Sequence, residues 1–432
     1  MKVNIPKKLT VWVLQTGEPL PCDAEDVRPM RAINLCNELI AKGHDVVLWS
    51  AKFDHAKKAH REHPSLIKLQ NSSLIIRLLN SPGYAKNIGF SRLWDHAVLA
   101  INLWRSLGDD VPIPDIVFIG YPPIETAYVM SRWLRKKNIP YLVDVKDQWP
   151  EIFLTPVPNL IKPIFRLLLY PYFYMGIKVM NGAIGLTAMA PSFLKWSLEF
   201  SGRINSSFDL VAPLTAPRYE FDPNALRDMN GWWRISSASP NNKVIFFVGN
   251  LSTKIYEFND VINAAKYFSN NPNLNFDFVI CGDGDYYLDL KKMTKDLDNI
   301  RLVGRVNRLQ IKALSSEAIA MIAPYKSTDD FRMSIPNKIL DALSLGVPIL
   351  SSLSGEVHDL LKNNEVGIFY NEGNVEELVA GIKELFHNSS FRDRMSLNAK
   401  NLYESEYAFE NVYGGLVNHI ENIANNCSDP HA

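Results

Sequence analysis

The second half of the chain contains the stretch Ser334-Ile335-Pro336-Asn337-Lys338-Ile339-Leu340-Asp341-Ala342-Leu343-Ser344-Leu345-Gly346-Val347-Pro348. It follows an apolar run, 318–324, and a polar loop, 325–333, an order that predicts a strand, a loop and a helix. Pro336 suits the first turn of this helix, where a missing N–H costs no hydrogen bond. Gly346 and Pro348 predict where the helix ends.

Two charged side chains share one face of this predicted helix. Lys338 and Asp341 are three residues apart, so they are neighbours on the helix surface. Backbone N–H groups without partners at a helix N-terminus attract anions. The stretch therefore predicts a site that holds a diphosphate and a ribose together, with Ser334 and Asn337 among the binding residues.

Length and composition bound the class of protein. A chain of 432 residues predicts two domains of about 200 residues each. The 46 Lys and Arg residues balance 46 Asp and Glu residues, and this zero net charge argues against nucleic acid as a main partner. The four scattered cysteines form no C-x-x-C pair, which indicates thiols in a reducing compartment. Neither a signal peptide nor an apolar stretch of about 20 residues is recognisable, so we expect a cytoplasmic protein.

Short apolar strands alternate with helical segments in both halves of the chain. Alternation of this kind predicts a parallel sheet covered on both faces. The strands predicted in the first half are 9–14, 45–49, 73–79, 116–119, 141–145 and 182–186, with the first helix at 29–41. Those predicted in the second half are 243–248, 276–280, 300–303, 318–323 and 348–351, with helices at 258–268, 376–386 and 391–407.

The segment 213–242 is rich in Pro, Asn and Ser and reads as the connection between two domains. The predicted fold class is therefore α/β, with two Rossmann-like domains facing across a cleft. The boundaries that we expect are 1–215 for the N-terminal domain and 240–404 for the C-terminal domain. A C-terminal helix at about 405–425 can pack back on the first domain.

Ligands bind at the carboxyl ends of the strands in sheets of this kind. In the second half, these ends carry the turns 249–254, 282–284 and 304–306. Glycine lets a backbone approach a ligand closely, and Lys and Arg offer cations for phosphates. Each turn alone is consistent with an ordinary connection, but several in one register favour a ligand site. The candidate residues in these turns are Asn250, Lys254, Gly282, Asp283, Arg305 and Val306.

The first half offers a second set of polar residues at strand ends. Gly17 ends the first strand, and Arg28 and Arg31 lead into the first helix, where either could contact a phosphate or lie on the surface. Asp147 lies in a dense charged segment after the strand 141–145; it could serve the site, form an ion pair or cap a helix. In the second half, Glu356 follows Gly355 and could approach the same ligand.

These motifs together resemble a large family of retaining glycosyltransferases that have the GT-B architecture and use nucleotide-activated sugars. Within that family, the chain is most similar to the O-antigen and capsule group related to fucosaminyltransferases. The resemblance extends from about Leu9 to Tyr407. It is carried by the segments 28–29, 42–46, 147–151, 282–284, 304–306 and 334–338.

The resemblance assigns roles by position. Asp341 stands where the family has a glutamate that holds the donor ribose, and Met333, eight residues earlier, replaces a second glutamate. Lys254 resembles a lysine that grips the donor diphosphate. Arg305 and Val306 lie where the base is read. The implied catalytic residues are Asp147, Lys254, Lys338 and Asp341, with Asp147 on the acceptor and sugar side.

The implied reaction transfers a sugar, as a hexosyl- or N-acetylhexosaminyl-transferase, from a nucleotide diphosphate donor to a glycan or lipid-linked acceptor. Retention of configuration, a UDP donor and a role in surface polysaccharide biosynthesis are expected. The C-terminal domain would bind the donor and the N-terminal domain the acceptor. Cations and a helix N-terminus can stabilise the leaving diphosphate, so neither a metal nor a cofactor is expected. The alternatives are a sugar-nucleotide epimerase of the same architecture and a non-catalytic nucleotide-binding scaffold.

The aromatic and basic stretch 160–178 has two interpretations. The first, which we favour from the sequence, is a buried or half-buried helix pair of the first domain. The second is an interfacial patch that contacts the inner face of the membrane. The resemblance strengthens the second interpretation, because the similar group acts on lipid-linked acceptors at that surface.

Overall fold

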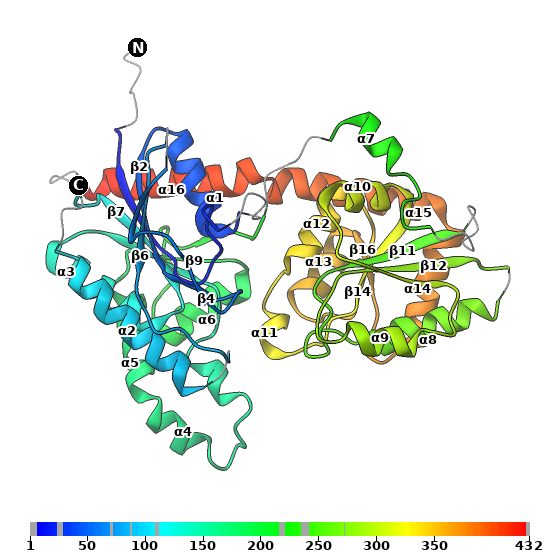
Figure 1. Cartoon of the computed structure of the whole chain (residues 1–432), viewed down its shortest axis with the longest axis horizontal. Helices are drawn as coiled ribbons and strands as arrows, with labels where there is room; N and C mark the ends of the chain where they lie inside the picture. Colours follow the sequence, from blue (N-terminus) through cyan, green and yellow to red (C-terminus); the bar gives the residue numbers. More distant parts are fainter. Residues whose placement is uncertain are drawn as a thin grey trace. The chain divides into compact units, whose positions relative to one another are not determined.

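The structure, a computed structural model, describes residues 7–23, 29–69, 72–86, 89–108, 112–215, 221–234, 242–271 and 273–428. The chain forms two compact units (Figure 1). The first unit comprises Met1–Ala216 and Phe409–Ala432, and the second comprises Pro217–Ala408. Each unit is built on one large sheet with helices on both sides, and we describe each by itself.

The first unit is built on an eight-stranded sheet with the order β10-β9-β8-β7-β1-β2-β6-β5. All neighbours pair in parallel except the edge strand β5, which is antiparallel to β6. A small antiparallel pair, β3 with β4, follows β2. The strands are β1 Thr10–Leu14, β2 Asp45–Ala51, β3 Phe53–Asp54, β4 Ala59–His60, β5 Leu66–Lys68, β6 Leu74–Leu79, β7 Ile116–Tyr121, β8 Tyr141–Val145, β9 Gly185–Ala188 and β10 Leu210–Val211.

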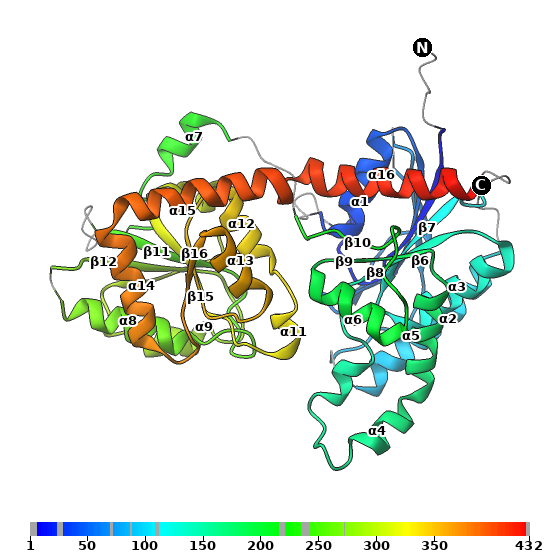
Figure 2. The ribbon, with the colours of Figure 1, turned by 180° about the vertical axis from the view of Figure 1, so that it is seen from behind.

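Helices connect these strands and cover the two faces of the sheet. The last helix of the chain, α16, returns to this unit and packs against α1, and it lies beside α1 in both Figure 1 and Figure 2. The helices are α1 Arg31–Ala41, α2 Phe90–Ser106, α3 Ile124–Lys137, the 3-10 helix η1 Glu151–Leu154, α4 Lys162–Leu168, α5 Tyr170–Gly182, α6 Pro191–Ser201 and α16 Phe409–Ser428.

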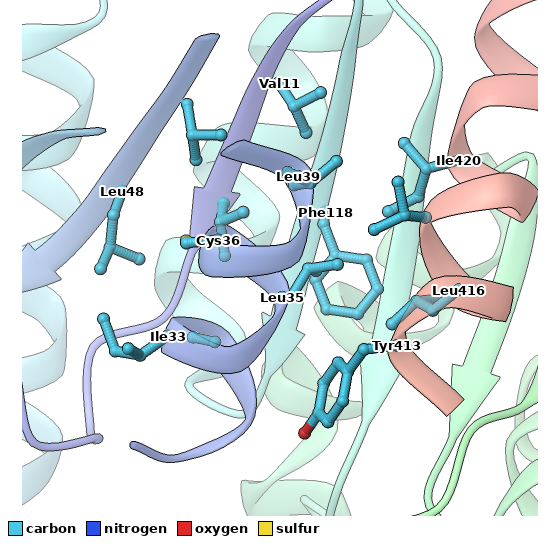
Figure 3. Packing of buried hydrophobic residues seen from close by; sticks show 14 of the residues in the cluster. Val11, Ile33, Leu35, Cys36, Leu39, Leu48, Phe118, Tyr413, Leu416 and Ile420 are labelled. Carbon is cyan, nitrogen blue, oxygen red and sulfur yellow. The ribbon is translucent and has the colours of Figure 1, made fainter. Parts of the chain in front are cut away.

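The alternation of side chains along β1 separates two packing layers. Val11 and Val13 belong to a buried cluster that also contains residues of α1 and α16, whereas Trp12 points to the other face. There the Trp12 ring stacks on Trp133 of α3, with the ring centroids 5.4 Å apart. Figure 3 shows Tyr413 and other α16 side chains filling the space beside α1. The core of the first unit is therefore completed by the end of the chain.

The second unit is built on a six-stranded parallel sheet with the order β13-β12-β11-β14-β15-β16. Its strands are β11 Lys243–Val248, β12 Phe276–Cys281, β13 Ile300–Gly304, β14 Ala318–Ala323, β15 Ile349–Ser351 and β16 Gly367–Phe369. Its helices are α7 Pro223–Asp228, α8 Phe258–Ser269, α9 Tyr287–Met293, α10 Arg308–Glu317, α11 Asp329–Arg332, α12 Asn337–Leu345, α13 Glu356–Asn364, α14 Val375–His387, α15 Ser389–Leu402 and the π-helix η2 Tyr403–Tyr407.

Three local predictions differ from the structure. The segment read as a connection contains α7, which begins because Asp222 accepts a hydrogen bond from the backbone of Asn224. The strand expected at 182–186 begins only at Gly185, since α5 continues to Gly182. The buried or half-buried helix pair expected at 160–178 is correct for α5, which buries Phe173 and three other residues, and wrong for α4, in which every residue except Lys162 is exposed.

A buried ion pair ties the parts of the first unit together. The Arg31 guanidinium at the start of α1 donates to both carboxylate oxygens of Asp144 in β8, at 2.7 Å each. It also donates to the carbonyl of Ala212, and Thr187 donates to the same carboxylate. Burial alone would raise the pKa of Asp144, but Arg31 holds it below its usual value. Because both groups are shielded from water, neither can lose its partner cheaply.

In the described ranges, no helix is long and apolar enough to cross a bilayer.

Replacing Arg31 by Met should destabilise the first unit by about 3–5 kcal/mol, because the Asp144 carboxylate would stay buried without its partner. Urea unfolding followed by circular dichroism measures this difference. The matched control is Lys195→Met, whose side chain is exposed on α6 and should change stability by less than about 0.5 kcal/mol. Equal unfolding midpoints for the two variants would contradict the role given to this ion pair.

Candidate active site

The carboxyl edge of the second sheet is held together by hydrogen bonds between successive turns. The backbone N–H of Gly249, after β11, donates to the carbonyl of Cys281 at 3.0 Å. The N–H of Gly282, after β12, donates to the carbonyl of Gly304 at 2.7 Å. The three glycine turns predicted from the sequence therefore meet at one edge, as parallel strands in register require.

Two of these glycines are required because backbone packs directly on backbone. Gly282 has φ +145°, and a Cβ atom there would overlap the carbonyl oxygen of Gly249. Gly284 has φ +159°, and its Cβ would meet the carbonyl of Leu251 and lie 2.8 Å from Oδ1 of Asn250. Side chains other than hydrogen are excluded by this geometry. The glycines thus allow neighbouring turns to pack closely, and this role is separate from letting the backbone approach a ligand.

Lys338 lies in the first turn of α12 and points under the first of these turns. Its Nζ atom lies 3.9 Å from the ring centroid of Phe247, 4.1 Å from that of Tyr256 and 5.3 Å from that of Tyr325. A Cβ atom on Gly249 would collide with this ammonium group. We call the three rings the aromatic cage; they come from β11, the turn before α8 and the loop after β14.

The aromatic cage leaves the ammonium group poorly compensated. Within the part of the chain that the structure describes, Nζ of Lys338 is shielded from solvent and has no hydrogen-bond partner. This burial holds the pKa of Lys338 well below its usual value, although Asp341 one turn later opposes the shift. Cation–π contacts offset only part of the cost of desolvating a charge. An anion that reached this group would be strongly favoured.

The start of α12, which carries this lysine, and the start of α13 both lie next to α11. Pro336 has extended backbone and caps α12, so the helix begins at Asn337, one residue later than the sequence suggested. Ser334, just before it, donates its hydroxyl to the carbonyl of Phe331 in α11. Gly355, at the start of α13, has φ +78°, and a Cβ there would overlap the carbonyl of Arg332. Glu356 is the first residue of α13, so this carboxylate belongs to the same edge of the sheet.

The remaining candidates in the second unit lie on its surface. The Asp283 carboxylate accepts a hydrogen bond from the N–H of Gly284, and it pairs with Arg305 at 3.4 Å between Nε and Oδ2. Both side chains are largely exposed, so this pair is worth at most about 1 kcal/mol. Asn250 and Lys254 are also exposed, in the turn after β11, and Val306 is half-buried after β13. The structure thus brings these residues to one edge, with Lys338 as the buried member.

In the first unit, the structure changes the interpretation of Arg31. Its guanidinium is committed to Asp144 and to the carbonyl of Ala212, so we withdraw it as a phosphate contact. It is also not the surface arginine of the alternative interpretation, since only 3 % of it is exposed. Arg28 lies outside the described residues. Gly17 follows β1 as expected, and Asp147 follows β8, where its carboxylate accepts from the N–H of Gln148 at 2.8 Å.

Some residues of these sites were missed from the sequence. Glu18, next to Gly17, accepts from the N–H of Ala32 at 2.8 Å and pairs with Lys146, so it links the first turn to α1 and to the segment after β8. The sequence could have indicated Glu18, because it directly follows Gly17, which was already a candidate. The aromatic cage had no comparable signal, because its three rings come from segments far apart in the chain.

Across the described ranges, no three His, Cys, Asp or Glu side chains come close enough to hold a metal ion together.

Comparison with known proteins adds to this geometry. Residues 232–402, most of the second unit, match the family model described as Glycosyl transferases group 1. The amylovoran biosynthesis glycosyltransferase AmsK of Erwinia amylovora is 28 % identical over 153 residues, which cover 34 % of this chain and 38 % of AmsK. The chain spans between 30 and 51 % of the length of the curated relatives that it matches.

Solved structures extend the similarity of the fold to both units. Sucrose-phosphate synthase from Thermosynechococcus elongatus superimposes with a TM-score of 0.69 at 12 % identity, covering 96 % of this chain and 99 % of that one. HepE from Anabaena, in a complex with UDP, has a TM-score of 0.63 at 14 % identity and covers 96 % and 100 % of the two chains. The predicted α/β class with two Rossmann-like halves is therefore confirmed, and the neighbours are glycosyltransferases of the GT-B fold.

The buried lysine should make stability depend on pH in a defined direction. Since the pKa of Lys338 is lowered in the folded state, the unfolded chain binds more protons between that pKa and the usual lysine value of about 10.4. The free energy of unfolding should therefore rise with pH in this window. Lys338→Met should lose this rise, and at lower pH it should be at least as stable as the wild type.

Urea unfolding between pH 6 and 10 measures this effect, with the exposed Lys254→Met as the matched control. The same pH slope in the wild type and in Lys338→Met would show that the ammonium group is not shielded as described.

Proposed function

We propose that the protein is a retaining glycosyltransferase that moves a sugar from a nucleotide diphosphate donor, with UDP as the expected nucleotide, to a glycan or lipid-linked acceptor. The observation that carries the proposal is the shielded ammonium group of Lys338 beside the start of α12. It belongs to the unit that matches the Glycosyl transferases group 1 model. A charged group that lacks contact with water is stabilised strongly when a multiply charged anion binds to it.

The donor would be held by residues from several strand ends. Lys338 and Lys254, with the backbone N–H groups at the start of α12, suit the diphosphate. Asp341 suits the ribose hydroxyls, and Arg305 with Val306 suits the base. Ser334, Asn337, Asn250, Gly282, Asp283 and Glu356 would complete the binding set.

The transfer step exchanges one bond for another at the anomeric carbon. The bond between this carbon and the diphosphate oxygen breaks, and the diphosphate leaves with the electron pair. The acceptor hydroxyl forms the new bond on the same face and gives its proton to the leaving phosphate oxygen. Lys254 and Lys338 would stabilise the charge that develops on the diphosphate, which is the largest electrostatic demand of the reaction. Asp147, in the first unit, would act on the acceptor and sugar side.

A role in surface polysaccharide biosynthesis is supported by the similarity to AmsK, whose name assigns it to amylovoran biosynthesis. Hexosyl or N-acetylhexosaminyl transfer fits this role. Met333 and Asp341, which depart from the family pattern, are the observations that favour a non-catalytic nucleotide-binding protein as the second candidate.

An exposed apolar surface on the first unit supports contact with a membrane. α4 and its flanks expose Leu160 (90 %), Leu167 (74 %) and Leu168 (69 %), and in Figures 1 and 2 α4 projects away from the sheet of its unit. α2 exposes a second stripe, Phe90, Trp94, Ile101 and Trp104. Soluble proteins rarely leave such surface uncovered.

The charged side chains in the segment that contains α4 have one sign. Between Glu151 and Glu199 the sequence contains no acidic residue, while it contains Lys162, Arg166, Lys178 and Lys195. Apolar side chains flanked by cations suit the interface of an anionic bilayer. We infer that α4 rests on such a surface and brings the first unit to lipid-linked acceptors.

Nucleotide binding should depend on the caged lysine. UDP should stabilise the wild type in a thermal shift assay, because a ligand that binds only the folded state raises the unfolding temperature. Calorimetry in buffers of different ionisation enthalpy should detect proton uptake, since a diphosphate beside Lys338 raises its lowered pKa. Lys338→Met should lose both signals, whereas Lys266→Met, exposed on α8, should keep them.

A panel of nucleotide sugars, with and without acceptor lipid extract, then separates the candidates. Transfer that requires acceptor supports the proposal. An isomerised sugar nucleotide formed without acceptor would indicate an epimerase, and tight binding without any product would indicate the scaffold.

Membrane binding should depend on the exposed leucines of α4. Leu167→Glu with Leu168→Glu should weaken cosedimentation with vesicles that contain anionic phosphatidylglycerol by about tenfold or more, because two apolar side chains are lost and two negative charges are gained. Leu397→Glu, on an exposed leucine of α15, is the control and should bind as the wild type does. Indifference of the wild type to these vesicles would remove the membrane contact.

A further inference from the structure

Two cationic side chains and a histidine surround one buried tyrosine at the carboxyl edge of the first sheet. Tyr84 follows β6, and its hydroxyl contacts Nδ1 of His55 at 2.5 Å. Nζ of Lys58 lies 4.4 Å from the Tyr84 ring centroid, and the Arg92 guanidinium lies 5.7 Å from it. His55 and Lys58 come from the turn between β3 and β4, whereas Arg92 comes from α2. We call His55, Lys58 and Arg92 the cationic cluster.

Two further aromatic side chains, Trp149 and His96, lie next to Tyr84 and Arg92. The Arg92 guanidinium lies 4.8 Å from the ring centroid of Trp149, which follows β8. The His96 ring, one turn after Arg92 on α2, lies 5.7 Å from Trp149 and 6.3 Å from Tyr84. Trp149 is held in place by a hydrogen bond from the Tyr121 hydroxyl to its carbonyl, at 2.7 Å. Side chains from three strand ends and from α2 thus form one continuous set.

The members of this set differ in their access to water. Tyr84, His96 and Trp149 are buried, whereas the three members of the cationic cluster are only half-buried. Lys58 also adopts the left-handed backbone conformation, with φ +55°, which is uncommon for lysine. The arrangement therefore puts positive groups at the accessible side and rings behind them.

Positive groups close to His55 and Lys58 disfavour the protonated form of each. Burial and then repulsion by Lys58, Arg92 and His96 lower the pKa of His55, and burial and then Arg92 lower that of Lys58. Asp54 opposes both shifts.

Two of the nearby carboxylates, Asp54 and Asp95, accept backbone hydrogen bonds that take up part of their charge. Asp54 accepts from the N–H groups of Ala56 and Lys57, Asp95 accepts from the N–H of Gly83, and Glu125 faces His96, with 3.6 Å between Oε2 and Nδ1. The ligand-free protein thus keeps an arrangement of cations that a bound anion would stabilise.

We propose that the cationic cluster binds the phosphate or diphosphate group of the sugar acceptor, with Tyr84 and Trp149 contacting the adjoining part of that molecule. The proposal rests on the proposed function, because it assigns the acceptor to the first unit. A lysine and an arginine that flank the same ring can grip two phosphate oxygens from different sides.

The position of Arg92 on α2 agrees with a membrane source for the acceptor. Arg92 and His96 point to the rings on the inner side of the helix, whereas Phe90 and Trp94 are exposed on its outer side. One helix thus places the Arg92 guanidinium beside the rings and exposes apolar side chains on its outer face. The phosphate group recognised here could belong to a lipid in the bilayer or to a water-soluble sugar. The experiment below separates these two sources.

Calorimetry with inorganic pyrophosphate tests the site itself, in the Lys338→Met background so that the proposed donor site does not contribute. Pyrophosphate should still bind this variant. Adding Arg92→Gln or Lys58→Gln should weaken binding by about tenfold or more, the usual loss for one charged hydrogen bond. Arg92→Lys should recover part of the affinity. Arg105→Gln, exposed at the end of the same helix, is the matched control and should have no effect.

Two further arms identify the source of the phosphate. Farnesyl diphosphate in anionic vesicles and glucose 1-phosphate in solution are compared in the full-length wild type and in Lys58→Gln, whose substitution lies in a surface turn. Tighter binding of the lipid, lost in Lys58→Gln, assigns a lipid-linked acceptor, whereas equal affinities assign a soluble sugar phosphate. Binding of both ligands that is unchanged in Lys58→Gln overturns the proposal.

The failures of the two proposals are distinguishable. If UDP binds the wild type but pyrophosphate does not bind Lys338→Met, the cationic cluster is not an anion site and the proposed function stands. If UDP does not bind while pyrophosphate binding still depends on Arg92, the donor assignment fails and the anion site stands.

Discussion

Direct contact between the backbones of neighbouring turns is the constraint on which the second unit depends. The turn after β12 lies against the carbonyl of Gly249, at a distance that leaves no room for a Cβ atom on Gly282. The turn after β11 in turn covers the ammonium group of Lys338. The start of α12, the aromatic cage and the turn after β13 are all positioned by this packing. Small changes in any one turn are therefore transmitted to the others.

The sequence allowed most strands and the glycine turns to be predicted, because both follow from local patterns. The strands β3, β4, β5, β10 and β16, which have two or three residues each, were not predicted. β8, β11 and β14 have the predicted bounds, and α12 begins one residue later than expected because Pro336 is extended. The environment of Lys338 could not be predicted. Its neighbours Phe247, Tyr256 and Tyr325 come from separate segments, and only tertiary packing brings them together.

The first unit departed further from expectation. Arg31 was chosen for its position before a helix, yet its partner Asp144 is far away in the chain, and sequence spacing cannot reveal a buried pair of this kind. The cationic cluster was missed for the same reason, because its residues are individually unremarkable in composition and order. The exposure of α4 was misjudged. Apolar and aromatic residues normally indicate a buried helix, and only the lysine and arginine residues between them indicated a surface helix.

The return of α16 to the first unit has a consequence for the order in which the protein folds during translation. Tyr413, Leu416 and Ile420 occupy the core beside α1, yet they are synthesised after the whole of the second unit. The ribosome adds about 5–20 residues per second, so the second unit can fold while the first still lacks its last layer. The nascent first unit then exposes the apolar face of α1 for many seconds, a natural target for chaperones.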